Sequence, residues 1–279
     1  MAEVILSGAD RKQFDEFGYL TFDTDLPNAI LEQAIKDFRP YWAGKITIGV
    51  NQADAGRVQD GWCVSDACLQ IATWPAVLSV LRQLYGRKTK PFQTLNFPAG
   101  TEQSAHSDAI HFNSEPFGLM CGVWVALEDV GASQGPLIYY PGSHRLPETN
   151  FPDLGLAPDP ASYPAYERCM QKLIWERQLK PAYGLIKKGQ AFIWAANLLH
   201  GGSARQDKSS SRHSQVTHYY LDGAKPWRPM FSKTERVYFE PDWISPEAAQ
   251  AARRRIAKER RELFIRRTKD AINRMLGRD

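Results

Sequence analysis

Apolar residues recur along this chain with two different spacings, and the spacings divide it into helical and extended segments. In the N-terminal third they recur every three to four positions, which is typical of amphipathic helices that bury one face. The first predicted helix can be capped by Ser7 or Asp10 and ended by Gly18, and a strand follows at residues 19–22. Two further helices are predicted over residues 26–42 and 71–85.

Beyond residue 90 the pattern changes to short apolar runs separated by turn residues, which is typical of strands. The predicted strands cover residues 91–97, 119–127, 136–140, 191–194 and 213–220. The run at 119–127 is apolar at almost every position, which indicates a strand deep in the core. The predicted fold class is therefore mainly β with flanking helices.

Two segments interrupt this pattern. Residues 44–68 are polar and contain several glycines, and we interpret them either as a loop across the mouth of a β-barrel or as a solvated connection. Residues 145–180 combine a proline-rich stretch with a predicted helix. An excursion of this length is usually functional or disordered, and we favour a lid or a wall of a substrate pocket.

The length of 279 residues suits one β domain with additions. We assign residues 1–245 to that domain and residues 246–279 to a basic helical extension. Between residues 253 and 279, 11 Lys or Arg stand against 4 Asp or Glu, whereas the whole chain carries a net charge of only +4. The extension is either a solvated charged face, or a contact with an acidic partner or with a second copy in a homo-oligomer.

Several partner classes are expected to be absent. No apolar run reaches the roughly 18 residues of a membrane helix, so no membrane association is predicted. No aromatic and basic platform for nucleic acid is recognisable. The N-terminus lacks the pattern of a signal peptide, and the four cysteines have no metal-binding spacing. A cytoplasmic location is expected, because a reducing compartment suits free thiols.

The candidate chemistry lies in the tripeptide His106-Ser107-Asp108. Residues two apart on a strand point to the same face, so a strand here would direct both side chains into a barrel mouth. An imidazole nitrogen and a carboxylate oxygen together suit a metal such as Fe(II), and two His with one carboxylate form the facial triad of non-haem iron oxygenases. His200 is the best candidate for the third ligand. Taken alone, the tripeptide favours a surface turn or a hydrogen-bonded pair, because short motifs often match by chance; its surroundings reverse this preference.

The surroundings of this tripeptide resemble the phytanoyl-CoA dioxygenase family of Fe(II)/2-oxoglutarate-dependent oxygenases. The likeness runs from about residue 10 to about residue 225, and its motifs occur in the family's order. They are the helix ending in Phe17-Gly18-Tyr19, His106-Ser107-Asp108, the run Trp124-Val125-Ala126-Leu127-Glu128-Asp129, the loop Pro141-Gly142-Ser143-His144, the distal His200-Gly201-Gly202-Ser203, and Arg212.

The resemblance implies a double-stranded β-helix core, of the jelly-roll or cupin-like type, and three cofactors: Fe(II), 2-oxoglutarate as cosubstrate, and O₂. It implies that His106, Asp108 and His200 are the catalytic metal ligands. It also implies that Arg212 grips the distal carboxylate of 2-oxoglutarate, since a guanidinium matches a carboxylate in two-pronged fashion. We prefer Arg212 to the nearby Arg205. Further contacts to this cosubstrate are predicted for Gln93, Trp124 and Ser203.

Substrate contacts are less constrained by the sequence. Arg57, Gln59 and Trp62 are candidates if residues 44–68 cross the barrel mouth. His111 and Asn113 follow the metal-binding tripeptide closely, and we interpret His111 as a pocket wall rather than a fourth ligand.

The function predicted is hydroxylation of an unactivated C–H bond of a small metabolite or natural-product intermediate, with release of succinate and CO₂. Desaturation or cyclisation would use the same site. The rival interpretation is a jelly-roll protein that binds metal without catalysis or with a different, cupin-type chemistry.

Overall fold

The computed structural model describes residues 4–275. Its helices are α1 (Gly8–Phe17), α2 (Asn28–Trp42), α3 (Asp66–Ala72), α4 (Pro75–Tyr85), α5 (Tyr163–Glu176) and α6 (Pro246–Met275). Its strands are β1 (Tyr19–Asp23), β2 (Gln52–Ala53), β3 (Val58–Gln59), β4 (Thr89–Phe97), β5 (Asn113–Glu115), β6 (Met120–Ala126), β7 (Leu137–Tyr139), β8 (Ala182–Gly184), β9 (Gln190–Ala195), β10 (His200–Gly202), β11 (Ser214–Leu221) and β12 (Lys225–Trp227).

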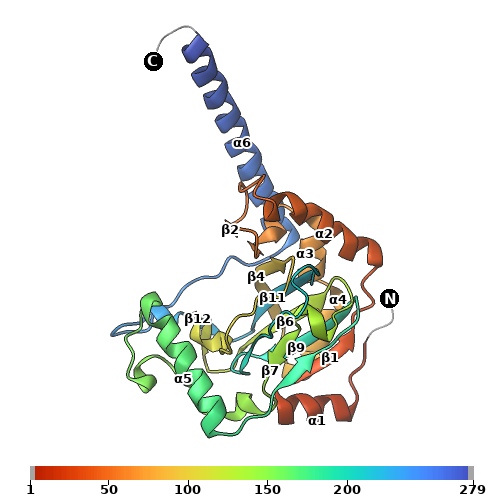
Figure 1. Ribbon diagram of the computed structural model, residues 1–279, viewed down its shortest axis with the longest axis vertical. Coiled ribbons are helices and arrows are strands. Elements are labelled where there is room, and N and C mark those ends of the chain that lie inside the picture. The colour runs from red at the N-terminus through yellow and green to blue at the C-terminus, as the bar shows by residue number, and fades with distance from the viewer. Residues whose placement is uncertain (1–3, 276–279) are drawn as a thin grey trace.

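The strands form three antiparallel sheets. The main sheet has seven strands in the order β1-β9-β6-β11-β4-β3-β2, a second sheet has the order β10-β7-β8, and β12 pairs with β5. The central strands β9, β6, β11 and β4 are thus neighbours although they come from distant parts of the sequence (Figure 1). The prediction of a mainly β fold with flanking helices is confirmed at this level.

Strand β6 is buried on both faces, and its alternating side chains enter two different cores. Cys121, Val123 and Val125 pack against α1, α2, α3 and α4 in one hydrophobic cluster. Trp124 and Ala126 point the other way, into a cluster shared with β7 of the second sheet. A layer therefore covers each face of the main sheet, which explains why this stretch lacks the polar alternation of a half-exposed strand.

The N-terminal helix begins and ends at the predicted residues. The Ser7 side chain accepts a hydrogen bond from the Asp10 amide, and Asp10 accepts one in return from the Ser7 amide. Gly18 closes the helix in the left-handed conformation at φ +78°, which favours a residue without a β-carbon.

Two helical predictions need correction. The helix predicted over residues 71–85 is two helices, α3 and α4, separated at Thr73 and Trp74. Pro75 is the physical reason, because proline disfavours a helical conformation at the residue before it but is well accommodated at the start of the next helix. The segment 44–68 is also more ordered than predicted, since it contains β2, β3 and most of the first turn of α3.

The C-terminal helix α6 begins on the body of the protein and then projects away from it (Figure 1). Its first turns are packed: Ala249 and Ile256 are buried in a cluster with Phe38 of α2 and with Trp62. Farther along, Phe264 and Ile265 are exposed. Within residues 4–275, no helix combines the length and the apolar composition needed to cross a bilayer. The last four residues of the predicted extension lie outside the described residues.

The packing of α6 predicts different costs for two isoleucines on the same helix. Ile256→Ala should lower the free energy of unfolding by about 2–5 kcal/mol, because it leaves a cavity in a buried cluster. Ile265→Ala is the matched control and should change it by less than about 0.5 kcal/mol, because Ile265 is 43% exposed. Urea denaturation of both variants checks this, and equal destabilisation would show that the root of α6 is not anchored as described.

Candidate metal centre

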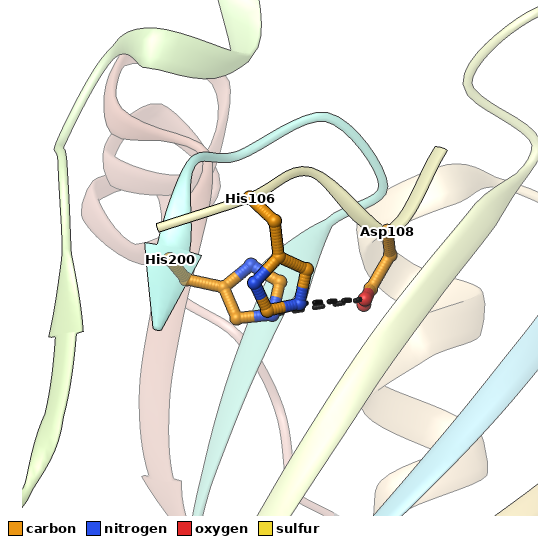
Figure 2. A group of neighbouring side chains, drawn as sticks. All are labelled: His106, Asp108 and His200. Carbon is orange, nitrogen blue, oxygen red and sulfur yellow. Dashed lines mark ion pairs between the residues drawn. The ribbon is translucent and has the colours of Figure 1, made fainter. Parts of the chain in front are cut away.

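Three buried side chains converge between the main and second sheets. His106, Asp108 and His200 each offer one ligand atom, and these atoms all lie within 4.8 Å of one another. The Nε2 atoms of both histidines lie 3.7 Å from Oδ1 of Asp108. Figure 2 shows the two imidazoles side by side, both facing the carboxylate. Two nitrogens and one oxygen at this spacing can hold a transition-metal ion such as Fe(II) and leave further coordination positions open.

The backbone that presents the first two residues is not the strand that we expected. His106 forms only an isolated bridge with His200, and Asp108 begins a short 3₁₀ turn over Asp108–Ile110. The expected alternation still operates locally, because the intervening Ser107 is extended at φ −108° and ψ 136°. One extended residue between the ligands is sufficient, and the turn then carries the chain away from the site.

Backbone carbonyls orient both imidazoles. Nδ1 of His106 lies 2.9 Å from the carbonyl oxygen of Ser104, and Nδ1 of His200 lies 2.9 Å from that of Leu198. A carbonyl can only accept, so each Nδ1 carries the hydrogen in these bonds and each Nε2 keeps its lone pair. Both rings therefore present a metal-binding atom to the same point.

The protonation states suit a cation. Burial, aided by repulsion from His200, lowers the pKa of His106 to about 4, so this ring is neutral at pH 7. Burial acts to raise the pKa of Asp108, but the neighbouring His200 and His218 lower it, and the net shift is downward. The group therefore combines an ionised carboxylate with a neutral imidazole, as a metal site requires.

The second oxygen of Asp108 is held from behind. Nε1 of Trp194 donates to Oδ2 at 2.7 Å, and Nε2 of His218 lies 3.3 Å from the same oxygen. Sequence reasoning missed both residues as parts of the site. Both lie within predicted strands, 213–220 and 191–194, and the sequence indicated no role for either in the site.

Arg212 lines the same cavity as the three candidate ligands, together with Trp124. The Arg212 side chain is 3% exposed, its guanidinium carbon lies 5.2 Å from the centre of a Trp124 ring, and its Nη1 donates to the carbonyl of Gly135. Among residues 4–275, its Nε has no hydrogen-bond partner. Burial, with repulsion from Arg205, lowers its pKa to about 10, so the group stays charged at pH 7. Arg205 itself binds the loop carbonyls of Lys208 and Ser210.

The other two predicted cosubstrate residues do not line this cavity. Gln93 is on β4, and its Oε1 lies 3.0 Å from Nδ1 of His218. Its link to the site therefore runs through His218 and Asp108. Ser203 donates its hydroxyl to the carbonyl of Pro136, which joins the segment after His200 to the start of β7.

Of the predicted substrate residues, His111 lies nearest to the candidate ligands. Its ring centre is 6.0 Å from that of His106, and its Nε2 is 3.3 Å from the hydroxyl of Tyr163. Asn113 is buried and donates to Glu148. Burial, with repulsion from His106, lowers the pKa of His111 to about 4, so this side chain is neutral at pH 7. His111 is not among the residues that line the cavity.

The remaining three candidates sit in the segment 44–68. Arg57 is half-buried, donates to Gln52, and is close enough to His111 to lower its pKa. Gln59 donates to the neighbouring Asp60. Trp62 is 6% exposed and packs in the cluster beneath α6, and it is not among the residues that line the cavity.

The segment 145–180 reaches the site through helix α5. The Tyr163 hydroxyl accepts from Gln103, whose amide lies 3.5 Å from Nε2 of His106. The Tyr166 hydroxyl accepts from the backbone amide of Ser107, between two candidate ligands. Sequence reasoning predicted a pocket wall here but identified neither tyrosine, because their position depends on how the insert folds back.

Comparison with known proteins identifies the family. Residues 14–214 match the sequence profile of the phytanoyl-CoA dioxygenase (PhyH) family, and this match covers more than half of the chain. The chain belongs to that family. It is 30% identical to "Phytanoyl-CoA dioxygenase domain-containing protein 1" of Danio rerio over 139 residues, which cover 47% of this chain and 43% of that protein. The chain thus spans less than half the length of this curated relative.

Solved structures show that the fold is shared with 2-oxoglutarate-dependent enzymes. The structure of EctD from S. alaskensis with 2-oxoglutarate and 5-hydroxyectoine is similar with a TM-score of 0.63 and 16% identity, over 86% of this chain and 84% of that one. The epimerase SnoN from nogalamycin biosynthesis, in complex with Fe³⁺, α-ketoglutarate and nogalamycin RO, is similar with a TM-score of 0.60 and 20% identity, over 84% and 95% of the two chains.

The geometry predicts that each of the three ligands is needed for metal binding. His106→Ala, Asp108→Ala and His200→Ala should each weaken Fe(II) binding by more than about 100-fold, which exceeds the usual effect of removing a residue that only supports a ligand. Anaerobic equilibrium dialysis measures this directly. His213→Ala is a matched control, because His213 pairs with Glu128 outside the triad, and a loss of iron in this variant equal to that of the triad variants would contradict the assignment.

Proposed function

We propose that this protein is a non-haem Fe(II)/2-oxoglutarate-dependent dioxygenase. His106, Asp108 and His200 hold the iron, and Arg212 holds the distal carboxylate of 2-oxoglutarate. When bound, iron with 2-oxoglutarate and O₂ would supply the oxidising power for C–H chemistry, with succinate and CO₂ as co-products. The protein's own part is to fix the ligands, to bind the cosubstrate at its far end, and to shape the substrate side of the pocket.

The observation that carries this proposal is the buried charge of Arg212 in the cavity of the candidate ligands. Burying an ion costs several kcal/mol even after the protein relaxes. The stack on Trp124 offsets about 0.5–2 kcal/mol, and the bond to Gly135 about 1.5–3 kcal/mol. Within residues 4–275 Arg212 forms no ion pair with a carboxylate, and its Nε is unpartnered. A carboxylate ligand that reaches from the metal to Arg212 would offset the remaining cost of burying this charge. 2-Oxoglutarate has a carboxylate at each end.

The fold supports the same proposal. We infer that the main sheet and the β10-β7-β8 sheet are the two sides of a double-stranded β-helix. The cavity is lined from both sides, by Leu95 and Trp124 of the main sheet and by Leu137 and Gly201 of the second. Ligand sites between the two sheets of such a barrel are common.

The substrate is proposed to be a small metabolite or natural-product intermediate, and the reaction a hydroxylation. Tyr163, His111 and Gln103 form a hydrogen-bonded set beside His106, and the first comes from the insert. The pKa of His111 is lowered to about 4 and that of Tyr163 is raised above its usual value, in both cases mainly by burial. All three groups are therefore neutral at pH 7, and this wall suits polar uncharged groups of a substrate.

The decisive experiment is an anaerobic titration of the metal-free protein with Fe(II) and then 2-oxoglutarate. A weak visible metal-to-ligand charge-transfer band should form when the keto acid chelates the iron. Candidate substrates can then be screened for those that stimulate succinate release. If iron binds but no band forms, the dioxygenase proposal fails, and a cupin-like metal-binding protein becomes the better description.

The role of Arg212 predicts a selective effect on the cosubstrate. Arg212→Ala should raise the Kd for 2-oxoglutarate by about 10- to 150-fold, which corresponds to losing about 1.5–3 kcal/mol of charge-assisted hydrogen bonding. The affinity for Fe(II) alone should change little. The charge-transfer band reports the Kd for 2-oxoglutarate, and anaerobic equilibrium dialysis without 2-oxoglutarate reports the affinity for Fe(II). Arg205→Ala is the matched control, and if it raises the Kd while Arg212→Ala does not, the wrong arginine has been assigned.

A further inference from the structure

We propose that Trp194 and His218 act together as a clasp that fixes the Asp108 carboxylate, so that it offers a single oxygen to the metal. This rests on the proposed iron site and concerns which residues position one of its ligands. The clasp comprises the indole N–H of Trp194, which donates to Oδ2 of Asp108, and the imidazole of His218, whose Nε2 lies 3.3 Å from the same oxygen.

The two oxygens of Asp108 have different surroundings. Oδ2 accepts from Trp194 at 2.7 Å and lies 3.3 Å from Nε2 of His218. Oδ1 lies 3.7 Å from the Nε2 atoms of both His106 and His200, on the side where the metal-binding atoms meet. A hydrogen on Nε2 of His218 would face an oxygen that can only accept. The Trp194 donor and the His218 contact both act on Oδ2, so together they restrain rotation of the carboxylate and leave Oδ1 as the free ligand atom.

The sheet register explains how two side chains from different strands reach one oxygen. Gly122 on β6 is paired with Trp194 on β9 and with His218 on β11. His218 is in turn paired with Gln93 on β4, which is 3.0 Å from its Nδ1. The four residues form one row across the four central strands. A β-carbon at position 122 would lie 2.2 Å from the Trp194 indole, so the glycine provides the space into which the ring folds.

The clasp has a direct consequence for the metal. A carboxylate that is free to rotate can bind through two oxygens and occupy an additional coordination position. A carboxylate held at Oδ2 binds through one oxygen and leaves that position for another ligand. Partners of this kind typically contribute 10- to 100-fold to metal affinity. Trp194 and His218 are therefore positioning residues, because they act through Asp108.

The test uses variants that remove or keep one N–H donor. Trp194→Phe keeps an aromatic ring without the indole N–H. His218→Asn can place an amide only near the position of Nδ1, whereas His218→Gln can place its N–H near that of Nε2. Trp74→Phe is the matched control, because Trp74 is also buried and donates its indole N–H, but to the carbonyl of Thr24. Each full-length, metal-free variant is titrated with Co(II), which is followed by its visible absorption, and thermal unfolding is recorded in parallel.

The expected result is that Trp194→Phe and His218→Asn bind Co(II) about 10- to 100-fold more weakly and with an altered absorption spectrum. His218→Gln should recover most of the affinity and the original spectrum. Trp74→Phe should lose thermal stability but bind Co(II) like the unaltered protein. Recovery in His218→Gln would show that the N–H donor positions Asp108. If the loss came only from disturbed packing, the glutamine amide would not restore the affinity.

The proposal is overturned if Trp194→Phe and His218→Asn bind Co(II) with unchanged affinity and spectrum, or if His218→Gln is as weak as His218→Asn. If His218→Asn does not fold, the Co(II) affinity and spectrum of Trp194→Phe alone decide whether the proposal stands. The unaltered protein separates this result from the proposed function. If it binds Co(II), and forms the charge-transfer band with Fe(II) and 2-oxoglutarate, only the clasp has failed. If it binds no metal, both proposals fall.

Discussion

The site depends on a pair of backbone hydrogen bonds between two segments that are far apart in the sequence. The amide of His106 donates to the carbonyl of His200, and the amide of His200 donates to the carbonyl of His106. This bridge sets the two candidate ligands opposite each other before any metal binds. It also places the tripeptide that carries Asp108 at the edge of β10, beside the main sheet. The other contacts of the site then only need to adjust side chains.

The family and the general fold could be predicted from sequence because their signals are local. The tripeptide at 106–108, the apolar run of β6 and the cap residues of α1 each lie within a few positions of one another. Such signals need only a spacing and a residue type. The same locality explains why Arg212 could be preferred to Arg205, since its distance from His200 along the chain matched the family, and the cavity then includes it.

The residues around Asp108 could not be found in this way. Trp194, Gly122 and His218 meet only through strand pairing, and a shift of one residue in either pairing would turn their side chains to the opposite face. The prediction of a strand through His106 and Asp108 was also wrong. One extended residue, Ser107, is enough to direct both side chains to the same side, and we had attributed that spacing to a whole strand. The register between strands and the way the insert folds over the site depend on contacts between distant parts of the chain. These contacts determine which residues surround a site, whereas the ligands themselves can be recognised from short motifs.

The hydrogen bond from the Ser107 amide to the Tyr166 hydroxyl links the insert 145–180 to the segment that carries the candidate ligands. Inserts of this kind usually tolerate substitution, whereas residues between two metal ligands do not. An insert that contributes to a substrate wall is free to diverge as enzymes acquire new substrates. In this protein the same helix also holds the main chain between two candidate metal ligands, His106 and Asp108. Exchanging residues 145–180 between relatives would therefore also change a contact that supports the proposed iron site. A chimaera without a tyrosine at position 166 would lose the bond to the Ser107 amide and could shift the loop that carries His106 and Asp108.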